Sequence, residues 1–332
     1  MTIKAAILLT AILLARVAAA VDGVQHDENL EAGRQAYEAG EYVKAAQLLR
    51  QAAVKTPQDP EIQLWLAKTY FESRQRDAAI SSAERAVALD PQNSVYHEWL
   101  GKVYGDKADH AGMFSALSLA KKARKEFARA IELDQKNFSA YQALIEFDCS
   151  APGMAGGGED KARAEIEKIA ALNATEGHYA AGNCARQKKD FTFAESEFDK
   201  ALAGHPSSAD LIYDIGDHAM KRDQPGRLLA VANEGERAAP EDPRGRFYRA
   251  VALVLKHDHL GHAEELLHEY LKIAPTRDNF PPAWRAHEWL GHLYEYQRKT
   301  QSAIDEYEIT LKLEPKSKPA REALKRLKKV NE

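Results

Sequence analysis

A four-residue pattern that recurs along the chain constrains the fold more than any other feature. The pattern is a small residue, an alanine twelve positions later, a second small residue after seven more, and a proline after a further five. Its first copy is Gly33, Ala45, Ala52 and Pro57. Its second copy, 34 residues on, is Ala67, Ala79, Ala86 and Pro91. A fixed step of this length indicates repeated units that stack on one another, because each unit alone cannot bury its apolar face.

Six further copies follow, of which three are clear and three are degenerate. The clear copies are Gly182, Ala194, Ala201, Pro206; Gly216, Leu228, Gly235, Pro240; and Gly291, Ala303, Thr310, Pro315. The degenerate copies begin at Gly101, Ile145 and Val251, and the last of them ends at Pro275. We therefore expect eight units, with bounds near 26–59, 60–93, 94–137, 138–174, 175–208, 209–242, 243–277 and 284–317.

The anchor residues have a simple physical explanation. Small residues such as Gly33 and Ala45 let two helix backbones approach closely, while neighbouring Tyr or Phe side chains fill the remaining volume. The prolines follow amphipathic runs and cannot continue a helix, so they end the second helix of each unit. The pattern predicts an all-α protein.

The pattern resembles the tetratricopeptide repeat. Leu100-Gly101 with Tyr104, and Leu290-Gly291 with Tyr294, agree with the signature of that family. The resemblance covers residues 26–317 and implies an α-α superhelix of eight antiparallel helix pairs. Residues 318–332 are expected to form a C-terminal capping helix, with Ala320, Leu324 and Leu327 on one side. Residues 95–165 also resemble a family of uncharacterised exported bacterial repeat proteins, which implies no activity.

The first twenty residues are typical of a signal peptide. Lys4 precedes an uncharged apolar run that ends in Ala18-Ala19-Ala20. Eleven uncharged residues lie between Lys4 and Arg16, whereas a membrane span needs roughly 20. We expect cleavage after Ala20 and a periplasmic or secreted protein, with an uncleaved N-terminal anchor as the alternative because Arg16 is close to the cut.

Composition narrows the class of partner. The hydrophobic and charged fractions, 45% and 29%, are those of an ordinary soluble protein. The formal net charge of −4 becomes −6 when Lys4 and Arg16 are removed with the signal peptide. A protein that follows a phosphate backbone normally has a basic excess, so we expect no nucleic-acid partner.

Cys149 and Cys184 are the two cysteines of the chain. An exported pair can form one disulfide, but spacing alone does not decide the question. The favoured interpretation is two buried thiols in a helical stack.

Insertions interrupt the pattern at residues 105–120 and 149–160, and six extra residues precede Gly291. The first insertion should lengthen its helices or add a turn between them. The second contains Gly156-Gly157-Gly158, but it lacks the Lys-Ser or Lys-Thr pair that ends a phosphate loop, and Glu159 and Asp160 would repel phosphate. We expect a flexible turn there and no nucleotide.

No nucleophile or acid–base signature stands out, so we expect neither an enzyme nor a cofactor. The alternative is a metal-binding or enzymatic protein that uses the histidine-rich seventh and eighth units. Its candidate ligands are His257, His259 and His262. Against it, two of these histidines lie in a turn, and no cysteine completes a ligand shell.

In tetratricopeptide repeats, the first helices of successive units line a concave groove. The resemblance implies a non-catalytic scaffold of the bacterial cell envelope, whose groove binds a peptide or protein through interleaved aromatic and charged residues. The residues expected to line it are Arg34, Tyr37, Lys68, Phe71, Glu98, Lys102, Tyr179, Asn183, Arg186, Tyr213, Asp217, Tyr248, His292 and Tyr296.

Overall fold

The computed structural model describes residues 28–274, 277 and 279–330 of the chain. The predicted signal peptide and Pro275 lie outside these residues. Within them the chain forms seventeen α-helices, one short 3-10 helix and no strand, so the all-α prediction is confirmed. None of the described helices is both long enough and apolar enough to cross a membrane.

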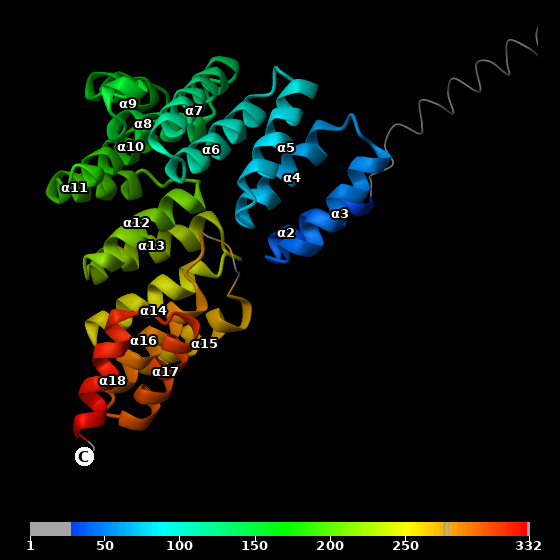
Figure 1. Ribbon diagram of the computed structural model, residues 1–332. Helices are drawn as coiled ribbons and strands as arrows, with labels where there is room; N and C mark the ends of the chain where they lie inside the picture. Colours follow the sequence, from blue (N-terminus) through cyan, green and yellow to red (C-terminus); the bar gives the residue numbers. More distant parts are fainter. Residues whose placement is uncertain (1–27, 275–276, 278, 331–332) are drawn as a thin grey trace, which may run out of the picture. The chain divides into compact units, whose positions relative to one another are not determined.

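The helices fall into two compact units, which divide after Leu89. The N-terminal unit contains two helix pairs (Figure 1). Its helices are α2 (Glu28–Glu38), α3 (Tyr42–Lys55), α4 (Pro60–Glu72) and α5 (Arg76–Leu89).

The C-terminal unit contains six helix pairs and one last helix. Its helices are α6 (Ser94–Asp109), α7 (Met113–Leu133), α8 (Phe138–Ser150), α9 (Glu159–Leu172), α10 (Ala174–Gln187), α11 (Phe191–Ala203), α12 (Ala209–Lys221), α13 (Pro225–Ala238), α14 (Arg244–Lys256), α15 (Leu260–Ile273), α16 (Ala283–Tyr296), α17 (Thr300–Leu313) and α18 (Lys318–Val330). Each of the eight repeats expected from the sequence thus contains one helix pair, and no helix extends beyond its expected repeat by more than one residue.

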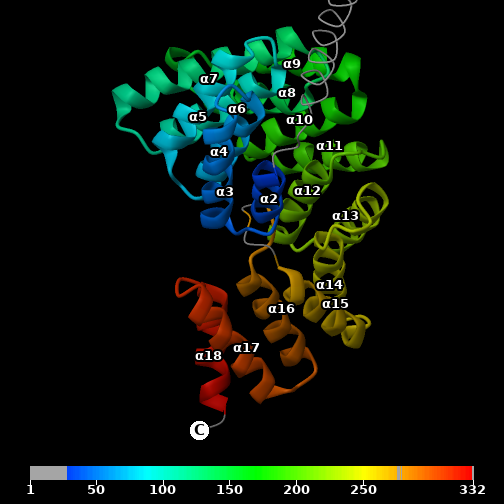
Figure 2. The ribbon, with the colours of Figure 1, turned by 90° about the vertical axis from the view of Figure 1, so that its right-hand side faces the viewer.

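First helices pack on first helices within this C-terminal unit. Contacts join α6 to α8, α8 to α10, α12 to α14 and α14 to α16, and each first helix also packs against its own second helix. Figure 2 shows the pairs of this unit following one another from α6–α7 to α16–α17, with α18 at the end. This arrangement is the predicted α-α superhelix. It places the side chains of successive first helices along one side.

Local signals in the sequence set the helix ends. Asp59 accepts a hydrogen bond from the Glu61 amide at 2.9 Å, and Pro60 occupies the first helical position of α4. At the other end of a unit, α5 stops at Leu89, two residues before Pro91. The prolines therefore follow the second helices, as their inability to continue a helix requires.

The small anchor residues sit where two helices approach most closely. A Cβ atom added to Gly101 would lie 2.5 Å from the Phe127 ring, and one added to Gly291 would lie 2.5 Å from the Tyr307 ring. Ala45 and Ala303 have no exposed surface. The expected pairing of a small residue with an aromatic side chain is therefore present, and a larger residue would separate the helices.

The first insertion lengthens its helix pair, as predicted. Helix α6 has 16 residues and α7 has 21, whereas α4 and α5 have 13 and 14. The second insertion forms the 3-10 helix η2 (Gly153–Ala155), followed by Gly156 at φ 101°. A left-handed backbone of this kind favours glycine, so the glycine run builds a turn.

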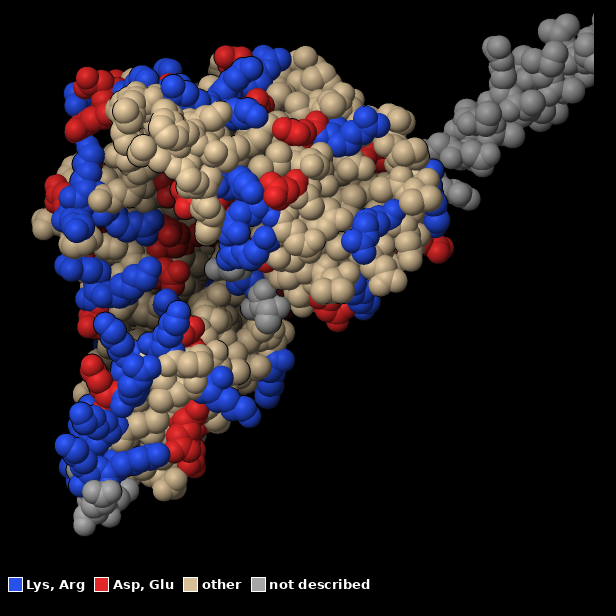
Figure 3. Space-filling model, in the orientation of Figure 1, with Lys and Arg blue, Asp and Glu red and all other residues tan. Residues whose placement is uncertain are grey.

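Helix α18 covers the end of the C-terminal unit. Ala320, Ala323 and Leu324 are buried against the preceding pair. Arg326 and Lys328 are exposed and form ion pairs with Glu295 of α16 and Glu308 of α17 at 2.5 and 2.7 Å. Figure 3 shows Lys and Arg side chains gathered at this end of the unit. A polar outer face of this kind is what the last element of a stack requires.

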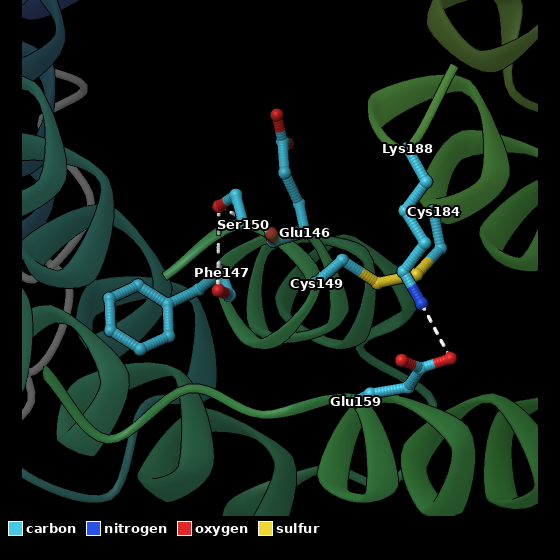
Figure 4. The surroundings of a disulfide bond; sticks show 7 residues. All are labelled: Glu146, Phe147, Cys149, Ser150, Glu159, Cys184 and Lys188. Atoms are coloured by element: carbon cyan, nitrogen blue, oxygen red, sulfur yellow. Dashed lines mark hydrogen bonds and ion pairs between the residues drawn. A yellow bond between two sulfur atoms is a disulfide. The ribbon is translucent and has the colours of Figure 1, made fainter. Parts of the chain in front are cut away.

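Cys149 on α8 and Cys184 on α10 form a disulfide, with their Cα atoms 5.6 Å apart (Figure 4). The favoured interpretation of two buried thiols is therefore wrong. The bond joins the first helices of two consecutive units, and beside it Glu159 pairs with Lys188 at 2.7 Å. It fixes the chain at Cys149, where the second insertion begins.

Candidate functional site

The tyrosines expected to line the groove are buried between helices. Tyr37, Tyr179, Tyr213 and Tyr248 expose only 4%, 9%, 2% and 1% of their surface. Their rings pack in the core, and Tyr213 stacks on Tyr248 with ring centroids 5.4 Å apart. The expectation that these rings offer anchoring area to a partner is corrected, because a buried ring has little surface to offer.

The hydroxyl groups of Tyr179 and Tyr248 bind carboxylates on the neighbouring first helix. Tyr179 on α10 donates to Asp214 on α12 at 2.9 Å, and Tyr248 on α14 donates to Asp217 on α12 at 2.9 Å. Burial, together with the adjacent aspartate, raises the pKa of both tyrosines well above its ordinary value. The hydroxyls therefore stay protonated and keep donating.

Charged side chains beside these tyrosine hydroxyls remain partly exposed to solvent. Arg186 and Asp214 form an ion pair at 3.0 Å, with 25% and 35% of their side chains exposed. Asp217 and Arg285 approach to 3.9 Å, with 44% and 27% exposed. We call Arg186, Asp214, Asp217 and Arg285, together with Lys102 and Glu146, the inner polar row.

Lys102 and Glu146 extend the inner polar row to α6 and α8. Lys102 pairs with Glu98 at 2.5 Å, and Glu98 is buried. Glu146 keeps solvent-exposed surface although protein surrounds much of it. That surrounding, together with the charge of Asp214, raises the pKa of Glu146. Figure 3 shows acidic side chains over α12, with Lys and Arg beside them on the left of the view.

Asn183, also expected in the groove, is buried and orients the row. Its side-chain oxygen accepts a hydrogen bond from Arg186 at 2.7 Å. Arg186 is thus held by one amide and one carboxylate, which fixes the direction of its guanidinium group.

Arg34, Lys68 and Phe71 belong to the N-terminal unit. Arg34 and Lys68 both lie over the ring of Trp65 on α4, at 5.1 and 4.2 Å from its centroid. Arg34 also pairs with Glu61 at 3.3 Å. Phe71 is half-buried at the end of α4. Two cations on one indole form a compact polar and aromatic cluster in this unit.

His292 and Tyr296 lie near the C-terminal end of the stack. Burial lowers the pKa of His292, whose ring lies 5.3 Å from the Trp289 ring. Tyr296 is 43% exposed and its ring contacts His257 at 3.8 Å. A hollow of about 390 Å³ adjoins His292, and it is lined by Trp284, Arg285, Trp289 and Lys221 among others.

The three histidines of the metal alternative point to different partners. His257 contacts Tyr296, His259 lies 2.6 Å from Asp258, and His262 lies 3.5 Å from Glu265. Among the residues that the structure describes, no group of three or more histidine, cysteine or acidic side chains is placed to hold a metal ion. The structure does not bring these histidines together.

The sequence pattern of the tetratricopeptide repeat family matches residues 36–103. The chain contains tetratricopeptide repeats. It is similar in fold to yeast Tom70, at 15% identity and a TM-score of 0.57, over 93% of this chain and 64% of that one. It is also similar to a chain of the APC/C hetero-tetramer Cut9–Hcn1, at 13% identity and a TM-score of 0.50, over 95% of this chain and 59% of that one.

A further solved structure is a thermophilic repeat protein of Thermus thermophilus, at 21% identity and a TM-score of 0.44, over 68% of this chain and 97% of that one. The chain spans less than two thirds of the Tom70 and Cut9–Hcn1 chains that it matches. No curated protein matches the sequence.

Several residues near the candidate site were not predicted from the sequence. Trp65, Asp214 and Trp289 were not among the expected groove residues, yet they contact Tyr37, Tyr179 and His292, which were. Spacing was the available signal, because Asp214 follows Tyr179 by 35 residues, close to one repeat. A tyrosine and an acid one repeat apart on first helices predict such a bond.

Proposed function

We propose that this tetratricopeptide repeat protein is a non-catalytic scaffold or adaptor of the bacterial cell envelope, and that it binds a peptide or protein partner along the inner polar row. Repeat folds of this kind generally mediate interactions between proteins and are typically non-enzymatic. Among the similar structures, Cut9 is found in a complex with Hcn1.

One observation carries the proposal, namely that exposed ion pairs are held in place by buried tyrosines. Tyr179 fixes Asp214, and Asp214 in turn faces Arg186. Because these charged groups are already held in one orientation, their side chains lose little further entropy when a partner binds. Both signs of charge alternate along first helices, which suits the amides and charges of an extended peptide or a helix.

The disulfide supports the envelope location. Bonds of this kind persist in oxidising compartments such as the bacterial periplasm, and they are rare in the cytosol. Cys149 and Cys184 are bonded, and the first twenty residues read as an export signal. Both features agree with a periplasmic protein.

Capture of partners from envelope extract tests the proposal. The bait is the mature chain, compared with Arg186→Glu, which reverses one charge of the inner polar row. Lys312→Glu is the matched control, because Lys312 is exposed on the second helix α17 and undergoes the same charge change. We expect wild type and control to capture the same protein and Arg186→Glu to lose it. Equal capture by all three baits, or a complete absence of captured protein, contradicts the proposal.

A further inference from the structure

A second concave site lies on the second helix α7, away from the inner polar row. It is a cavity of about 640 Å³ between the start of α6, the latter part of α7 and the insertion that follows α8. Four cationic and two acidic side chains of α7 line it: Lys121, Arg124, Lys125, Arg129, Glu126 and Glu132.

The carboxylates of this cavity already have partners of their own. Glu126 lies 2.6 Å from Nδ1 of His97, and Glu132 lies 3.1 Å from Arg129. Lys121 and Lys125 are exposed, and neither forms an ion pair with any residue that the structure describes. The cavity therefore holds two ammonium groups whose charge is not neutralised.

The spacing of these lysines suits a compact anion. They are four residues apart on α7, so their side chains leave the helix one turn apart, about 6 Å from each other. An anion between them can accept hydrogen bonds from both ammonium groups. Arg129 follows four residues later in the lining, where it is paired with Glu132, so the two lysines carry the uncompensated charge.

The opposite wall of the cavity is firmly held. Arg124 donates to both oxygens of Asp148 at 2.9 and 3.1 Å, and the Asp148 side chain is fully buried. The backbone amide of Gly158 donates to the Asp148 carbonyl at 2.9 Å. Lys161 donates to the Gly156 carbonyl at 2.6 Å. These bonds fix the turn that brings Ala155 and Gly156 to the cavity edge.

We propose that this cavity binds a phosphate group, from a small phosphate or from a phospholipid headgroup. The two lysines supply the positive charge and N–H donors that phosphate requires. His97 is the one aromatic ring among the lining residues described, and it is buried and engaged with Glu126, so the site has no surface for stacking a base. The wall at Ala155 and Gly156 closes one side, which favours a compact anion over an extended acidic chain.

Calorimetric titration of the mature chain with inorganic phosphate at low salt tests the site. The variant is Lys121→Gln with Lys125→Gln. The control is Lys325→Gln with Lys329→Gln, two exposed lysines with the same spacing on α18. We expect saturable one-site binding in wild type and control, weakened by roughly tenfold or more in the α7 variant. Because all four lysines are exposed, both variants should keep the wild-type circular dichroism.

Co-sedimentation with vesicles separates the two sources of phosphate. Phosphatidylcholine vesicles, with or without phosphatidylglycerol, are mixed with the same three proteins. Lysine-dependent binding to phosphatidylglycerol vesicles assigns a lipid headgroup, and binding of inorganic phosphate without vesicle binding assigns a small phosphate. The proposal is overturned if neither probe binds saturably, if the α7 variant binds like the control, or if a glutamate-rich peptide binds the lysines more tightly than phosphate.

Discussion

The hydroxyl of Tyr179 donates to Asp214 at 2.9 Å and thereby joins the first helix of one repeat to the first helix of the next. Arg186 reaches the same carboxylate at 3.0 Å from the solvent side. One buried ring thus positions one exposed ion pair. Single residues such as Tyr179 therefore link the packing between repeats to the orientation of the charged groups in the inner polar row.

Tyr179→Phe tests this coupling. The change removes the hydroxyl but keeps the ring, so Asp214 loses its buried donor. We expect a loss of about 1–2 kcal/mol in the free energy of unfolding, measured by urea denaturation, because one hydrogen bond to a charged group disappears. Partner capture should also weaken, since Arg186 then faces a less constrained carboxylate.

Tyr296→Phe is the matched control for this substitution. Tyr296 is 43% exposed and makes its described contact through its ring, with His257. Removing its hydroxyl should change the free energy of unfolding by less than about 0.5 kcal/mol. If both variants lose the same stability, the bond between Tyr179 and Asp214 has no special role.

The repeat pattern was sufficient to predict the fold because its anchors report contacts between adjacent helices. Gly101 must be small because Phe127 lies against it, and this requirement recurs at one fixed spacing. Helix ends followed from local chemistry, as at Asp59 and Pro60. Such short-range constraints are visible in a single sequence.

The site was less predictable because burial depends on neighbours outside the repeat. Tyr213 and Tyr248 occupy first-helix positions that face inward in the family, but each ring packs on the other and loses its exposed surface. The pairing of Cys149 with Cys184 depends on how the second insertion places the end of α8 beside α10. Their separation of 35 residues is close to one repeat, but because an insertion lies between them it does not give the distance between the two side chains.

Arg244→Met is expected to destabilise the C-terminal unit strongly. The guanidinium lies between the rings of Tyr213 and Phe280, at 4.5 and 4.4 Å. It also pairs with Asp242 at 2.7 Å, and only 5% and 11% of these two side chains are exposed. Its removal leaves a buried carboxylate without its partner, which typically costs about 3–5 kcal/mol. Chemical denaturation of the purified variant gives this value.

Arg246→Met provides the comparison. Arg246 sits two residues away on α14, with 35% of its side chain exposed, and it pairs with Glu269 at 3.5 Å. A half-exposed pair of this geometry contributes about 0–1 kcal/mol. A loss for Arg244→Met no larger than that for Arg246→Met would refute the anchoring role.

Removal of the disulfide should destabilise the protein without abolishing the fold. The bond closes a loop with a sequence separation of 35 residues, for which chain entropy predicts about 3–4 kcal/mol. The double variant Cys149→Ser with Cys184→Ser should unfold at lower urea concentration than wild type, and wild type treated with reductant should match it. Thiol titration of the unfolded, unreduced wild type should find no free thiol, and two free thiols would disprove the bond.

The export prediction is tested by the N-terminus of the mature protein. Expressed in full in a Gram-negative host, the chain should be recovered from the periplasm beginning at Val21, because the signal pattern ends at Ala20. Edman sequencing or intact mass identifies the first residue. Recovery from the cytoplasm with Met1 retained would contradict cleavage, and membrane-bound material with Met1 retained would favour the uncleaved anchor.

His97 should make stability depend on pH in a direction opposite to that of an ordinary buried histidine. Its Nδ1 lies 2.6 Å from Glu126, and its Nε2 lies 3.1 Å from the Pro91 carbonyl. Both partners accept hydrogen bonds, so the ring binds them best when it is doubly protonated. The hydrogen bond to Glu126 raises the pKa of His97 above its ordinary 6.5, although burial opposes this.

Because the folded protein holds this proton more tightly than the unfolded chain, the contribution of His97 is fully present below pH 6.5 and is lost as pH rises through the raised pKa. The measured quantity is the difference in the free energy of unfolding between wild type and His97→Gln. That difference should shrink with rising pH. Wild type alone is not informative, since burial lowers the pKa of His218 and His292 and makes stability rise with pH. The control is His262→Gln, at an exposed histidine. If the difference in the free energy of unfolding between wild type and His97→Gln stays constant from below pH 6.5 to above the raised pKa, the ring acts only by packing.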